Sequence, residues 1–149
     1  MRILVVANET LVGEALHEAV RHASARAGTQ VHVVCPALNS RLRHYVSDTA
    51  AAREAAQGRL DLTLQRLASA GIQATGEVGD GDPLLAIQDA LRTGGADELI
   101  ISTHPESRSN WLERGVVETA RRRFGLPTTH VVVDLGQEQA RAGPETVDA

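Results

Sequence analysis

Residues 2–7 read Arg-Ile-Leu-Val-Val-Ala, a short and nearly continuous apolar run at the beginning of a 149-residue chain. A run of this kind is typical of a strand that is buried on both faces of a parallel sheet. Similar runs return at Val31–Cys35 and Glu98–Ser102, and more alternating ones occur at Ile72–Val78 and Thr129–Asp134. The sequence therefore predicts five strands, of which Ile72–Val78 lies nearer an edge of the sheet.

Amphipathic helices are predicted between these strands, because apolar residues recur there at helical spacing. One helix follows Thr10 and ends before Gly28, and a longer one opens at Ser47 or Asp48 and stops at Gly71, after a loop over residues 36–47. Asp82 and Pro83 form the N-cap and first residue of the next helix. The last helix, with Leu112, Val116, Ala120 and Phe124 on one face, is closed by Gly125 and Pro127. Strands that alternate with helices indicate an open, doubly wound α/β fold with helices on both faces of a parallel sheet.

The composition excludes several classes of function. All 15 basic residues are arginines, so no lysine is present for a Walker A loop or a Schiff base. The net charge of −4 gives no driving force for nucleic-acid binding. No apolar run approaches the roughly 18 residues of a membrane helix, and a single cysteine is typical of a reducing compartment. We therefore expect a cytoplasmic protein that binds neither nucleic acid nor membranes.

Ligands of open parallel sheets bind outside the carboxyl ends of the strands. The loops that reach this edge are Asn8–Thr10, Pro36–Ser40, Gly79–Asp82 and Thr103–Asn110. The last is the richest, because hydroxyl, imidazole, guanidinium and amide groups directly precede a helix whose free N–H groups suit a phosphate or carboxylate. The alternative is that Ser109 or Asn110 only caps that helix.

Other candidate sites have structural alternatives. Gly79–Leu84 superficially resembles a dinucleotide-binding fingerprint, but Leu84 stands where the third glycine is needed. Asp80 and Asp82 could hold a hard cation, although Asp82 already serves as a cap. Among the six histidines, His17 and His22 fall on the polar side of the first helix, while His32 and His130 lie inside strands, where a structural hydrogen bond is expected. Cys35 is interpreted as an apolar filler of a buried strand.

The chain resembles the universal stress protein family over Arg2–Thr10, over Gly81-Asp82-Pro83 at a helix start, and over Ala96–Gly115. This resemblance implies a five-stranded parallel sheet in the order 3-2-1-4-5, a Rossmann-like fold of the adenine nucleotide alpha hydrolase-like type. It also implies a domain over residues 1–135, and the polar residues 136–149 are expected to form a disordered tail. A homodimer through the last strand, Thr128 to Asp134, is implied as well, and the alternation of Thr129, Val131 and Val133 predicts an apolar edge there that needs covering.

The nucleotide site of that family uses an aspartate after the first strand and a G-x2-G-x9-G-[ST] pattern after the fourth. Here Asn8 takes the place of the aspartate, Pro105 and Arg108 replace the first two glycines, and Gly115 is kept before Val116. Proline has no N–H and arginine adds bulk where the phosphates would approach, so binding of ATP or AMP in the family's manner is disfavoured. Arg108 could instead bind a small anion or a monophosphate through its fork of N–H groups, or pair with a neighbouring glutamate.

The resemblance and the loop chemistry together favour a non-catalytic regulatory or stress-response module that binds a small anion or a partner. A nucleotide-binding protein with slow hydrolysis, in which His104 or Glu106 positions water, is one alternative, and a purely structural dimer is the other. The predicted ligand-binding residues come from the ends of three strands and from the loop after the fourth strand: Ala7, Asn8, Glu9, Pro36, Ser102, Thr103, His104, Arg108, Ser109, Asn110, Gly115 and Val116.

Overall fold

The computed structural model describes residues 1–7, 14–37, 48–103 and 115–132. Within these ranges the strands are β1 (Arg2–Ala7), β2 (Gln30–Pro36), β3 (Ala74–Gly79), β4 (Glu98–Thr103) and β5 (Thr128–Val132). The helices are α1 (Glu14–Ala23), α2 (Asp48–Ser69), α3 (Pro83–Gly94) and α5 (Val116–Phe124). The strands are all parallel and lie in the order β3-β2-β1-β4-β5. The expected sheet type and strand order are both confirmed.

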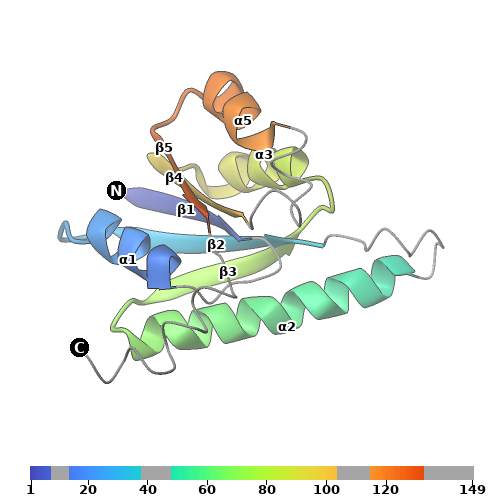
Figure 1. The fold of residues 1–149 in the computed structure, drawn as a ribbon, viewed down its shortest axis with the longest axis horizontal. Helices are drawn as coiled ribbons and strands as arrows, with labels where there is room; N and C mark the ends of the chain where they lie inside the picture. The colour runs from blue at the N-terminus through green and yellow to red at the C-terminus, as the bar shows by residue number, and fades with distance from the viewer. Residues whose placement is uncertain (8–13, 38–47, 104–114, 133–149) are drawn as a thin grey trace.

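The sheet separates two layers of helices, with α1 and α2 on one face and α3 and α5 on the other (Figure 1). Alternate residues of the three central strands, β2, β1 and β4, feed the two cores. In β1, Ile3, Val5 and Ala7 join the core under α1 and α2, whereas Leu4 and Val6 join the core under α3 and α5. Burial on both faces explains why this strand is continuously apolar.

The start of α3 follows the prediction from Asp82 and Pro83. The Asp82 carboxylate accepts a hydrogen bond from the Leu84 N–H at 3.0 Å, and Pro83 occupies the first turn. The Asp80 carboxylate accepts a bond from the Asp82 N–H at 2.9 Å. The two aspartates thus form the turn that enters the helix, and dinucleotide and cation binding are not needed to explain them.

Several strand boundaries and the orientation of one side chain differ from the predictions. β3 begins at Ala74 and continues through Gly79, which was predicted to lie in a loop, and Thr103 closes β4. Val131 was predicted to form an apolar edge with Thr129, but it is only 8% exposed and packs into the core beneath α1. The exposed apolar side chain of β5 is Val132, at 48%. No helix within the described ranges combines the length and the apolar character needed to cross a bilayer.

Candidate functional site

The strand order reverses at β1, whose neighbours are β2 on one side and β4 on the other. The chain proceeds from β1 to β2 and β3 in one direction, and β4 and β5 complete the sheet in the other. At the carboxyl end of this switch point Ala7 of β1 is paired with Ser102 of β4. This edge is where a doubly wound sheet leaves room for a ligand.

The Ser102 hydroxyl is an unusual feature of this edge. The residue is fully buried, and its Oγ has no hydrogen-bond partner among the described residues. A buried hydroxyl left without a partner costs about 1–3 kcal/mol. Among the described residues, Ser102 therefore leaves a buried hydroxyl without a hydrogen bond at the switch point.

Thr103 lies next to Ser102 but points to the opposite face of the strand, where its hydroxyl is hydrogen bonded to His130 of β5. The distance from Oγ1 to Nε2 is 2.6 Å, and Thr103 is only 1% exposed. Burial lowers the pKa of His130, the nearby Arg121 lowers it further, and Glu118 acts in the opposite direction. With a neutral imidazole, the Thr103 hydroxyl can donate to Nε2, and the end of β4 is thereby tied to the edge strand.

Gly115 has a left-handed backbone, with φ 64° and ψ 33°, directly before α5. A Cβ built on it would meet nothing within 4 Å, so its requirement for glycine comes from the backbone and not from crowding. Val116 is 3% exposed and belongs to the core under α3 and α5. On the other side of β1, Pro36 is the last residue of β2 and pairs with Gly79.

The structure therefore brings together part of the predicted site. Ala7, Ser102 and Thr103 meet at the ends of β1 and β4, Pro36 ends the next strand, and Gly115 and Val116 open the helix that covers β4 and β5. The remaining predicted residues lie outside the described ranges: Asn8, Glu9, His104, Arg108, Ser109 and Asn110.

Cys35 is fully buried in β2, as the sequence predicts for an apolar filler. Burial raises the pKa of its thiol to about 12, against the smaller opposing effect of Arg59. The thiol form is therefore the stable one at neutral pH. The part of the chain that the structure describes contains no group of three or more histidine, cysteine or acidic residues able to hold a metal ion.

The structure confirms the structural hydrogen bond expected for His32, whose partners the sequence did not identify, and it gives His17 a groove-lining position that the sequence did not predict. His32 is hydrogen bonded to Thr75 and to Glu77 on the neighbouring strand. The spacing of Thr75 and Glu77, two residues apart, already indicates that their side chains share one face of a strand. It does not show that this strand pairs with the strand of His32. His17 was placed on the polar side of its helix; it is half-buried and lines a groove of about 530 Å³ between α1 and α2.

Comparison with known proteins supports the fold. No family model matches the sequence, and no curated protein matches it. Among solved structures, the chain is similar to a universal stress protein family protein from Arabidopsis thaliana with AMP bound, with a TM-score of 0.55 and 11% identity. The match covers 92% of this chain and 95% of the other.

The fold and its switch point define this protein as a doubly wound α/β domain. More particularly, its fold is similar to that of the universal stress protein family structure from Arabidopsis thaliana.

Proposed function

We propose that this protein is a non-catalytic regulatory module, like a universal stress protein, that binds a small anionic ligand at the carboxyl ends of β1 and β4. The observation that carries the proposal is the buried Ser102 hydroxyl, which lies at the switch point without a partner among the described residues. In the sequence, Arg108, Ser109 and Asn110 follow β4 within a few residues, and we propose that their guanidinium, hydroxyl and amide groups complete the site. An arginine fork and hydroxyl donors are a suitable set for one phosphate or carboxylate.

A triphosphate is a poorer candidate for this site. Relatives with the glycine pattern bring backbone N–H groups close to the phosphates, whereas Pro105 has no N–H and Arg108 has a large side chain. Gly115 keeps its left-handed conformation at the third glycine position. One left-handed glycine turn is insufficient to hold three linked phosphates, so we expect binding of a monoanion or monophosphate in preference to ATP.

Calorimetry with inorganic phosphate, AMP and ATP tests the proposal. We expect phosphate or AMP to bind more tightly than ATP and Arg108→Ala to weaken that binding at least about tenfold, the equivalent of one lost charge-assisted contact. Arg92→Ala is the matched control, because Arg92 is an exposed arginine in the last turn of α3. Unchanged affinity in Arg108→Ala would refute the site, and absence of binding by all three compounds would refute the anion-binding function.

The second candidate is a nucleotide-binding protein with slow hydrolysis. One observation favours it: the structure with the similar fold contains AMP. In this case ATP binds, and both Asn8→Ala and Gly115→Val weaken ATP binding. Asn8 stands in place of the family's aspartate, and Gly115 stands at the third glycine position of its nucleotide-binding pattern. ATP affinity that is stronger than phosphate affinity and sensitive to both substitutions would favour this candidate over the first.

We also propose a cytoplasmic homodimer formed through β5 and the residues after it, up to Asp134. β5 is an edge strand of the sheet, and Thr129 and Val132 are exposed on it. Open edges of this kind are usually covered in native proteins. Sedimentation at micromolar concentration should give the mass of a dimer, and Val132→Arg should shift it to the monomer; a monomeric mass for the unmodified protein would refute the proposal.

A further inference from the structure

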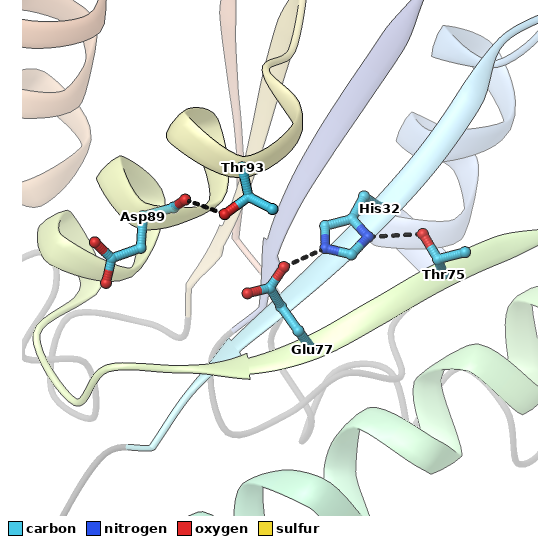
Figure 2. A network of polar contacts seen from close by, with 5 residues as sticks. All are labelled: His32, Thr75, Glu77, Asp89 and Thr93. Carbon is cyan, nitrogen blue, oxygen red and sulfur yellow. Dashed lines mark hydrogen bonds and ion pairs between the residues drawn. The ribbon is translucent and has the colours of Figure 1, made fainter.

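A hydroxyl, an imidazole and a carboxylate lie in line on the β2–β3 side of the sheet, away from the switch point (Figure 2). The Nδ1 of His32 is 2.6 Å from the Thr75 hydroxyl, and its Nε2 is 2.6 Å from the Glu77 carboxylate. His32 is paired with Thr75 in the register, and Glu77 is paired with Val34, two residues further along. Because alternate residues of a strand share one face, both partners reach the same imidazole.

The chemistry of the partners fixes the direction of both hydrogen bonds for a neutral imidazole. An ionised carboxylate can only accept, so Nε2 carries the proton and donates it to Glu77. Nδ1 is then left as the acceptor, and the Thr75 hydroxyl donates to it. The carboxylate holds the ring in the form in which its other nitrogen is a base directed at a hydroxyl, the arrangement that activates an alcohol as a nucleophile.

Thr75 differs in this respect from the other hydroxyls of the described chain. Thr93 donates to the Asp89 carbonyl at 3.0 Å (Figure 2), and Thr29 likewise donates to a backbone carbonyl. A carbonyl oxygen cannot remove a proton at neutral pH. Thr103 has an imidazole partner, His130, but it is 1% exposed and therefore closed to reagents. Thr75 combines a base, an orienting carboxylate and an exposed side chain.

We propose that Thr75 is an acyl-accepting nucleophile, with His32 as its general base and Glu77 as the residue that positions His32. The substrate class is a small activated acyl ester or thioester. The Thr75 Oγ attacks the acyl carbonyl carbon and forms a new ester bond while its proton passes to His32 Nδ1. The bond from the acyl carbon to the leaving oxygen or sulfur breaks, and the leaving group departs with the electron pair and takes the proton from His32 or from water. The result is an O-acylated Thr75 and one released alcohol or thiol, with no oxidant or reductant required.

This inference goes beyond the proposed function, since it concerns another face of the sheet and a covalent modification. β2 and β3 are paired strands of the sheet, so the three groups lie on regular strand backbone and not on a loop. The side chain of His32 is 12% exposed, so the base is shielded, whereas Thr75 itself is exposed. General-base assistance of this kind contributes about 10²- to 10⁴-fold to a rate.

The experiment treats the full chain with p-nitrophenyl acetate and measures acetylation of each hydroxyl by peptide mass spectrometry. Thr93 serves as an internal control, because it is exposed and its hydroxyl is bonded to a carbonyl. We expect Thr75 to be acetylated about 100-fold faster than Thr93, with one equivalent of p-nitrophenolate released in step. Equal rates at the two threonines would overturn the proposal.

Variants separate activation from mere exposure. His32→Gln keeps a polar side chain without the base and should reduce acetylation of Thr75 to the level of Thr93, while Thr75→Ser should retain it. Glu77→Gln should lower the Thr75 rate at least about tenfold, and Glu77→Asp should restore part of it because the carboxylate returns. Unchanged acetylation in His32→Gln would overturn the assignment of the base. If that variant fails to fold, Glu77→Gln in the same assay decides, and an unchanged ratio of Thr75 to Thr93 acetylation there refutes the proposal.

Discussion

Gly79→Ala is predicted to destabilise the protein, because β3 and α3 approach closely at this glycine. A Cβ at position 79 would lie 2.8 Å from the Ala86 Cβ of α3 and 2.9 Å from the Val34 Cγ1 of β2. Ordinary contacts begin near 3.4 Å, so the helix or the strand must move by roughly 0.6 Å. Neither neighbour is a flexible chain end: one is a helix Cβ and the other a β-branched side chain in the core.

The expected cost follows from these contacts. Overpacking of a close-packed core typically costs about 1–3 kcal/mol. Alanine also lowers the conformational entropy of the unfolded chain, and this effect stabilises the folded protein by about 0.4–1 kcal/mol. The backbone at Gly79 is outside the left-handed region, so no conformational strain is added. We therefore expect a net loss of about 1–2 kcal/mol in the free energy of unfolding.

Gly58→Ala provides the matched control, because the same chemical change has the opposite sign there. Gly58 is exposed in the middle of α2, and a Cβ on it would meet nothing within 4 Å. Replacing glycine by alanine in a helix interior should stabilise the protein by about 1 kcal/mol. Urea unfolding followed by far-UV circular dichroism should place the two midpoints on opposite sides of the unmodified protein, with equal slopes. A Gly79→Ala variant as stable as Gly58→Ala would refute the close approach of β3 and α3.

The remaining predictions concern a buried thiol, a helix cap and a titrating histidine. Cys35, with its pKa raised to about 12 by burial, should not react with a thiol reagent in the native protein at mildly alkaline pH but should react fully in guanidinium; rapid native reaction would contradict its burial. Asp82→Ala should lose about 1 kcal/mol of stability by denaturant unfolding, because the Leu84 N–H loses its cap, and an unchanged midpoint would exclude a stabilising role for it. The lowered pKa of His130 means that the unfolded chain binds a proton more readily, so the stability that this group contributes above pH 6.5 should be lost as the pH falls through its folded pKa. His130→Gln should flatten that part of the pH dependence, and an identical slope in the variant would show that His130 is not responsible.

Local sequence patterns predicted most of the secondary structure correctly. The Asp82-Pro83 pair located the start of α3 because a carboxylate cap and a fixed φ act within a few residues. The continuous apolar run at residues 2–7 identified a strand buried on both faces. The prediction that the Val131 side chain forms an uncovered apolar edge was wrong, because the alternation of a strand does not say which of its faces meets a helix layer.

The candidate site was predicted less completely than the fold. The position of the ligand edge at the strand ends could be predicted, since parallel strands end together. Two features of the site could not be predicted: the Ser102 hydroxyl without a partner among the described residues, and the hydrogen bond between Thr103 and His130. Each depends on which strands are neighbours in the sheet. For the same reason, the hydrogen bonds that join Thr75, His32 and Glu77 could not be predicted from the sequence.

The sequence by itself determined the alternation of strands and helices, the absence of lysine chemistry and the presence of Pro105 and Arg108 after the fourth strand, because these properties depend on residue type and short-range spacing. The tertiary structure decided which side chains meet. The pairing of β1 with β4 places Ala7 beside Ser102, and the pairing of β2 with β3 places His32 between a hydroxyl and a carboxylate. Such contacts join residues far apart in the chain, and they are selected by the packing of helices on both faces of the whole sheet rather than by any local preference.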